Sequence, residues 1–101
     1  MNGSTMFLNK KIKAIRLEEK LTQVEFCQLI DIPVISIQNY EREIRSPSGD
    51  NLMKIVNHPQ FEKYALWFVT GKTAPESGQI CPAFSIQEQC GITVNKEEKR
   101  A

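Results

Sequence analysis

Two overlapping helix-start signals near residue 22 constrain this chain more than any other feature of its sequence. Thr22 and Glu25 stand three residues apart, the spacing at which each side chain accepts a hydrogen bond from the other residue's backbone amide. Leu21 and Phe26 flank them at the positions where two apolar side chains pack together across a helix start. A helix is therefore predicted over about residues 23–30.

A second short helix is predicted directly after the helix over residues 23–30. Pro33 favours extended geometry in the preceding residue, which ends the helix over residues 23–30, and its own fixed φ suits the first turn of a new helix. The new helix is predicted over about residues 34–42, with Ile37 and Tyr40 three residues apart on its inner face. Two short helices joined by a tight turn are thus expected.

The rest of the chain predicts an all-α fold with five helices in total. Apolar residues at helical spacing predict a first helix over residues 6–20. Ser48 is a typical N-cap residue for a fourth helix, and a fifth is predicted over residues 61–70, with Gly71 as its stop. We expect residues 1–72 to form the helical domain.

The predicted fifth helix is apolar on more than one face, although a surface helix needs only one buried stripe. We expect a second copy of the chain to cover the other face, ahead of a purely internal core. Residues 73–101 carry Pro and Gly and are expected to form a tail with a frayed end, in which short strands over 80–84 and 92–94 pair across the dimer. The residues assigned to dimerisation are Tyr64, Trp67, Phe68, Ile80 and Phe84.

The composition is that of an ordinary globular protein. Hydrophobic residues make up 41% and charged residues 25% of the 101 positions, which suits a single domain. No stretch approaches the roughly 20 apolar residues that span a bilayer, and the first residues lack the apolar core of a secretion signal. We therefore expect a cytoplasmic protein without a membrane partner.

The reactive side chains indicate neither catalysis nor a metal site. Cys27, Cys81 and Cys90 are widely spaced without a CxxC pair, so we expect reduced thiols, with Cys27 packed as a small hydrophobe. His58 has no arranged partner and is more typical of a solvated helix end than of a ligand. No Gly-rich phosphate loop is present. We expect no enzyme activity, no cofactor and no small-molecule ligand.

The formal net charge of +1 argues against a nucleic-acid partner, because phosphate binders usually carry a basic excess. The distribution of the charges leaves a local basic rim open, and an ordinary solvated helix face is the equal alternative. The basic residues concerned are Lys10, Lys11, Lys13, Arg16 and Lys20 in the first helix, followed by Arg42 and Arg45 after the third.

Two short helices joined by a tight turn are the arrangement that delivers side chains to a DNA major groove. Over about residues 8–58 the chain carries Ile15-Arg16, Leu21-Thr22-Gln23, Glu25-Phe26-Cys27, Ile37, Tyr40-Glu41-Arg42 and Ser46-Pro47. Together these segments resemble the signature of the lambda-repressor and Cro-like (XRE-type) helix-turn-helix family. Residues 60–80, QFEKYALWFVTGKTAPESGQI, resemble more narrowly the short immunity repressors of peduovirus-type temperate phages.

This resemblance implies a transcriptional repressor that binds double-stranded operator DNA as a homodimer in a bacterial cell, with residues 1–72 as the DNA-binding domain. It implies directly repeated half-sites rather than a palindrome. By position, an ion pair between Arg16 and Glu41 orients the helices. The base-reading positions fall on Val34, Ile35, Gln38 and Asn39, and the DNA-backbone positions on Thr22, Gln23, Ser36, Arg42, Arg45 and Ser46.

Three positions depart from the family pattern. The family usually has glycine at Asp31 and Glu43 and a small hydroxyl residue at Pro33. Asp31 is expected to adopt a left-handed conformation and to reach the first amides of the next helix in place of the missing cap. Glu43 lies near the expected phosphate path without an evident benefit. The alternative to a repressor is an antitoxin-like interaction module that grips another protein through the aromatic fifth helix and the tail.

Overall fold

Helices account for nearly all regular structure in residues 2–94, the part of the chain that this computed structural model describes, with side chains from residue 8 onward. The α-helices are α1 (Asn2–Glu18), α2 (Gln23–Ile30), α3 (Val34–Glu41), α4 (Gly49–Val56), α5 (Ala65–Thr70) and α6 (Phe84–Gln89), and the 3-10 helices are η1 (Glu62–Tyr64) and η2 (Pro75–Ser77). Within residues 2–94 the only β-type pairing is one isolated antiparallel bridge between Ala74 and Gln79. The predicted all-α fold class is confirmed.

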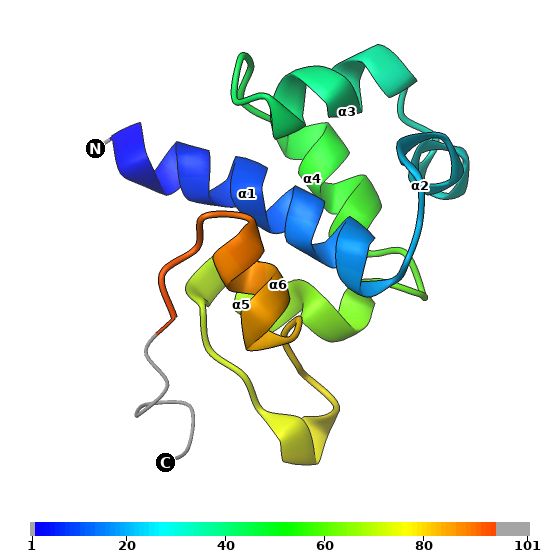
Figure 1. The fold of residues 1–101 in the computed structure, drawn as a ribbon. Coiled ribbons are helices and arrows are strands. Elements are labelled where there is room, and N and C mark those ends of the chain that lie inside the picture. Colours follow the sequence, from blue (N-terminus) through cyan, green and yellow to red (C-terminus); the bar gives the residue numbers. More distant parts are fainter. Residues whose placement is uncertain (1, 95–101) are drawn as a thin grey trace.

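The helix α1 organises the fold. In Figure 1 it crosses the middle of the molecule, with α2 and α3 on one side and α5 and α6 on the other, and it contacts α3, α5 and α6. The pair α2 and α3 and the pair α5 and α6 therefore lie on opposite sides of α1.

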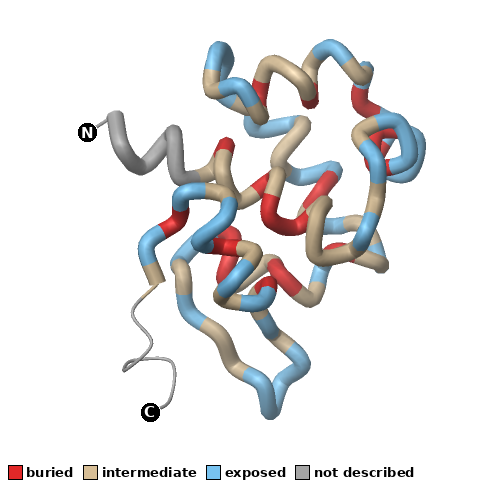
Figure 2. The backbone as a smooth tube through the Cα atoms, viewed as in Figure 1, coloured by how far each residue is buried: buried red, intermediate tan, exposed pale blue. Residues whose placement is uncertain are grey.

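The hydrophobic core collects side chains from all the helices that surround α1, and the buried positions in Figure 2 follow their inward faces. The rings of Phe26 and Phe61 meet edge to face with centroids 5.1 Å apart. Burial of such side chains is the main source of stability in a domain of this size. The largest buried side chains include Ile12, Ile15, Phe26, Ile37, Ile55, Phe61, Tyr64, Trp67 and Phe68.

The predicted fifth helix is divided. Residues 62–64 form η1, and α5 follows and ends at Gly71, whose φ of 82° is the left-handed stop expected of glycine. Tyr64, Trp67 and Phe68 are all buried within the single chain. These three side chains therefore leave no exposed surface for a second copy to cover, and the exposed apolar residue of α5 is Val69 instead.

The strands predicted over 80–84 and 92–94 are wrong. Phe84 instead begins α6, and the backbone N–H of Ala83 at the start of this helix donates to Glu18 Oε1 of α1 at 2.8 Å. Ile92 forms no strand and is buried in the core. The tail up to residue 94 is thus part of the packed fold, while the predicted frayed end lies outside the described residues.

Candidate nucleic-acid interface

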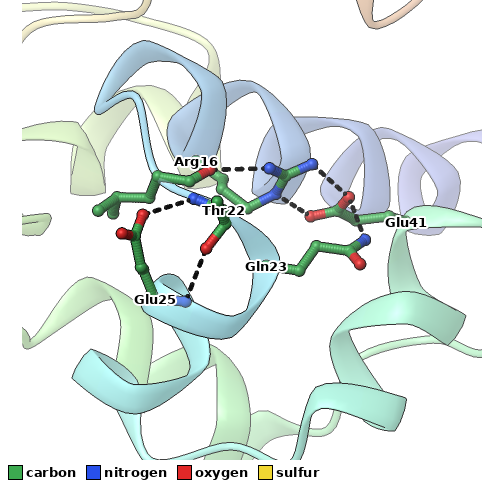
Figure 3. A network of polar contacts seen from close by, with 6 residues as sticks. Arg16, Thr22, Gln23, Glu25 and Glu41 are labelled. Atoms are coloured by element: carbon green, nitrogen blue, oxygen red, sulfur yellow. Dashed lines mark hydrogen bonds and ion pairs between the residues drawn. The ribbon is translucent and has the colours of Figure 1, made fainter.

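The start of α2 is fixed by the reciprocal cap that the sequence predicts. Thr22 Oγ1 accepts the N–H of Glu25 at 3.1 Å, and Glu25 Oε1 accepts the N–H of Thr22 at 2.9 Å (Figure 3). Such a cap is worth about 1 kcal/mol and defines where the chain enters the helix. The first amides of α2 therefore hold a fixed direction.

The turn between α2 and α3 is built without glycine. Asp31 adopts the left-handed conformation at φ 58°, and Lys54 Nζ of α4 donates to its carbonyl oxygen at 2.9 Å. Ile32 is buried, and Pro33 stands at the N-cap of α3 without a side-chain hydrogen bond to that helix. The expected cap from Asp31 is therefore not formed, and α3 begins with its first amides uncapped by any described side chain.

A polar network behind α3 joins three helices. Arg16 of α1 grips Glu41 of α3 with two parallel hydrogen bonds, Nε to Oε2 at 2.7 Å and Nη2 to Oε1 at 2.9 Å (Figure 3). Gln23 of α2 donates its amide to the same Glu41 Oε1 at 3.0 Å, and Arg16 Nη1 donates to the carbonyl of Leu21 at 2.9 Å.

This network is largely removed from water. The side chains of Arg16 and Glu41 are only 11% and 5% exposed. A forked arginine–carboxylate pair is directional, so it fixes the angle between the helices as well as their distance. The network therefore sets the orientation of α3 relative to both α1 and the start of α2.

The outer face of α3 combines one exposed apolar side chain with half-buried amides. Ile35 is 60% exposed, and on the neighbouring α2 Val24 is 51% and Leu29 is 39% exposed. Ser36, Gln38 and Asn39 are half-buried beside Ile35. Val34 packs in part against the core, so it lies at the margin of this face.

The end of α3 is a two-bond terminal turn. The N–H of Ile44 donates to the carbonyl of Asn39 at 2.9 Å and that of Glu43 to the carbonyl of Tyr40 at 3.0 Å. Glu43 takes the left-handed position at φ 62°, which is strained for a residue with a side chain. Its carboxylate lies 3.6 Å from Lys10 Nζ of α1, and this ion pair gives Glu43 a structural role that the sequence did not show.

Asn9 is a second residue that sequence reasoning missed. Its side-chain amide donates to the carbonyl oxygens of Tyr40 at 2.7 Å and of Arg45 at 2.9 Å. The sequence signal was its position three residues before Ile12, which places a polar side chain on the buried stripe of the first helix.

The basic rim is narrower than the count of lysines suggests. Lys10 pairs with Glu43, and Lys11 Nζ donates to the carbonyls of Trp67 at 2.9 Å and Phe68 at 3.3 Å, where it caps the end of α5. Arg42, Arg45 and Ser46 are exposed after α3. Lys10 and Lys11 are thus held by contacts within the chain, while the basic residues beyond α3 are exposed.

Within residues 2–94 no group of three His, Cys, Asp or Glu side chains is placed to hold a metal, and no helix has the length and apolar character to cross a membrane. Cys27, Cys81 and Cys90 are free thiols, and burial raises the pKa of Cys27 and of Cys90. Raised pKa values make both thiols poor nucleophiles.

Comparison with known proteins agrees with this geometry. The helix-turn-helix family profile matches residues 12–61. The chain is 38% identical to Repressor protein C of Escherichia phage P2 over 78 residues, which are 77% of this chain and 79% of that protein. It is 36% identical over 52 residues to the HTH-type transcriptional regulator ImmR of Bacillus subtilis (strain 168), which covers 52% of this chain and 41% of the regulator. With its capped α2, its tight turn and its anchored α3, the chain belongs to the helix-turn-helix family.

Proposed function

We propose that this protein is a sequence-specific DNA-binding repressor of phage immunity, which reads its operator with the outer face of α3 in the major groove. The observation that carries this proposal is the contrast between the two faces of α3. Its inner face is locked by Arg16 and Gln23, while its outer face keeps Ile35 exposed among half-buried amides. The similarity to a phage repressor and to a transcriptional regulator supports the same function.

The side chains of the outer face suit base edges. An aliphatic side chain such as Ile35 can contact a thymine methyl, and the amides of Gln38 and Asn39 can pair with adenine. Val34, at the margin of the face, is expected to contact a base only at the leading end of α3. Base discrimination thus depends chiefly on Ile35, Gln38 and Asn39.

The residues around α3 suit the DNA backbone. Arg42, Arg45 and Ser46 are exposed beyond its end, and Ser36 lies on its first turn. Thr22 and Gln23 stand at the front of α2, where the helix amides attract a phosphate. The bond from Gln23 to Glu41 holds this amide in place before DNA arrives.

Operator binding as a dimer in the cytoplasm of a bacterial host is the second part of the proposal. Because Tyr64, Trp67 and Phe68 are buried in one chain, the contact is expected to use exposed apolar residues of α5 and the tail. Ile80, together with Val69 at 71% exposed and the half-buried Phe84, supplies such a surface. The same burial weakens the interaction-module alternative, because the aromatic residues that were to grip a partner face the core.

Selection from a pool of random duplexes tests the proposal, because it reports binding, base preference and half-site spacing together. The wild-type protein should enrich one motif. A variant with Ile35, Gln38 and Asn39 all changed to alanine should remain folded and lose the preference while keeping weak binding to any duplex. Wild-type protein that enriches nothing, or a triple variant that enriches the same motif, would overturn the proposal.

Single variants separate the two contact classes. Asn39→Ala should cost about 1–3 kcal/mol on the enriched duplex and relax one base preference. Arg45→Ala should weaken binding to all duplexes alike. It should also lower by about one the salt slope, which is the decrease in the logarithm of the binding constant per unit increase in the logarithm of the salt concentration. Thr70→Ala, on the exposed part of α5, is the control and should change neither quantity.

A further inference from the structure

The buried side chain of Asn9 joins two points of the chain on either side of the end of α3. It is 2% exposed, and its amide nitrogen donates to the carbonyls of Tyr40 and Arg45, residues that are five positions apart. A buried amide is costly unless its donors are satisfied, and here both hydrogens end on backbone oxygens. The side chain of Asn9 is therefore committed to the shape of this turn.

The turn needs such a tie. Glu43 lies between the two acceptors in a left-handed conformation that glycine adopts more easily, and Ile44 and Arg45 are exposed to solvent. Two backbone hydrogen bonds close the turn, from the N–H of Ile44 to Asn39 at 2.9 Å and from the N–H of Glu43 to Tyr40 at 3.0 Å, but neither involves Arg45. The other ties are longer, namely the N–H of Arg45 on the carbonyl of Asn39 at 3.4 Å and the ion pair between Lys10 and Glu43 at 3.6 Å. Asn9 is thus the one described side chain that binds the backbone of Arg45 itself.

We propose that Asn9 is a positioning residue for DNA binding, which fixes the backbone of Arg45 from beneath and so aims the Arg45 guanidinium at a phosphate. This inference rests on the proposed function. Asn9 is buried behind the turn and makes no contact with DNA, so its effect passes entirely through Arg45. Any loss on removing Asn9 should then be the loss of one phosphate contact.

The experiment compares Asn9→Ala with a matched variant, Gln87→Ala. Gln87 is also 2% exposed, and its side-chain amide also donates to a backbone carbonyl, that of Pro82 at 2.7 Å, but it lies in α6. Each change is made alone and together with Arg45→Ala. Binding to a random-sequence duplex and to the duplex enriched by wild-type protein is measured over a range of salt concentrations, after circular dichroism shows that each variant is folded.

Asn9→Ala should weaken binding to both duplexes by about tenfold, as expected for the loss of one hydrogen-bonded contact to a charged phosphate. It should also lower the salt slope by about one. Adding Arg45→Ala to Asn9→Ala should then have little further effect, because the contact is already lost. Gln87→Ala should lower the melting temperature without changing the salt slope or the effect of Arg45→Ala.

The wild-type salt slope in Asn9→Ala, or full additivity of Asn9→Ala with Arg45→Ala, would overturn the inference. Asn9→Leu, which keeps the volume and removes the donors, should give the same slope as Asn9→Ala. If both Asn9 variants fail to fold while Gln87→Ala folds, Asn9 acts on stability alone and the inference falls. If wild-type protein itself shows no preference for the enriched duplex over the random-sequence duplex, the proposed function is overturned instead. The comparison of the two duplexes with wild-type protein therefore distinguishes the two failures.

Discussion

Lys10 Nζ and Glu43 Oε2 lie 3.6 Å apart across the junction between α1 and the end of α3. The pair partly neutralises an acidic side chain that stands close to the proposed path of a phosphate. It also spans the same junction as the hydrogen bonds of Asn9, so two neighbouring residues of α1 hold one turn.

Changing Glu43 to glutamine should tighten DNA binding. The substitution removes a negative charge beside the interface and releases Lys10 to meet a phosphate, so the salt slope should steepen by about one. Affinity should rise on random and selected duplexes alike, because no base contact is involved. Titrations at several salt concentrations measure both quantities.

Glu76→Gln is the control for net charge, since Glu76 is exposed in η2, outside the proposed interface. It should leave the slope unchanged. An equal rise in affinity for both variants would show that total charge, and not the position of Glu43, is responsible.

Glu41→Ala should be strongly destabilising, because it leaves the buried guanidinium of Arg16 without its carboxylate. Breaking one side of a buried pair costs about 3–5 kcal/mol, and urea denaturation measures the loss. Replacing both partners with apolar residues, as in Arg16→Met with Glu41→Leu, should recover much of the stability. DNA binding should not recover, because Gln23 has lost its anchor. A double variant that binds like wild type would contradict the orienting role.

Trp67→Ala should lower the free energy of unfolding by about 3–5 kcal/mol, because it opens a cavity in the core. The association constant, measured by sedimentation under folding conditions, should stay fixed. Val69→Ala is the matched change on the exposed face of the same helix and should leave stability nearly unchanged. Loss of self-association in Trp67→Ala without loss of stability would return Trp67 to the dimer interface.

Acid should weaken the fold through Glu19. Burial acts to raise the pKa of this carboxyl, but hydrogen bonds from Tyr64, Gln60 and Lys63 outweigh burial, and the pKa is lowered from its ordinary 4.5. A depressed carboxyl pKa stabilises the folded state above the unfolded value, and this contribution is lost as the pH falls through the folded value. The melting temperature of wild-type protein should therefore decrease as the pH drops below about 4.5.

Glu19→Gln should flatten this acid dependence, because the amide does not titrate. Glu76→Gln, a charge change away from the cluster, should keep it. If the melting temperature of Glu19→Gln falls with acid as steeply as that of wild-type protein, other carboxyl groups cause the acid sensitivity.

Local signals predicted the helix-turn-helix well. The cap of Thr22 with Glu25 and the break at Pro33 each act on the few residues beside them, so the bounds of α2 were predicted as observed and the end of α3 within one residue. The pair of Arg16 with Glu41 came from family resemblance, since no spacing rule links residues on different helices.

Long-range contacts account for what the sequence did not show. The start of α6 depends on Glu18, which is distant in sequence, and a run with Pro, Gly and β-branched residues favours strands when that partner is not considered. The burial of Trp67 and Phe68 likewise depends on α1 and the tail. Asn9 was overlooked because a single polar residue on an apolar stripe carries no local signal of its acceptors.

The packing of α6 on α1 determines where this protein can be cut or extended. A fragment ending at Lys72 would remove the side chain of Gln79, which accepts the N–H of Leu66 in α5 and donates to the carbonyl of Glu62 in η1, and would uncover one side of α1. Since the other side of α1 carries Arg16 and Asn9, such a fragment would weaken the contacts that position α3 and the turn after it. Reporter or effector fusions should therefore be joined beyond Val94.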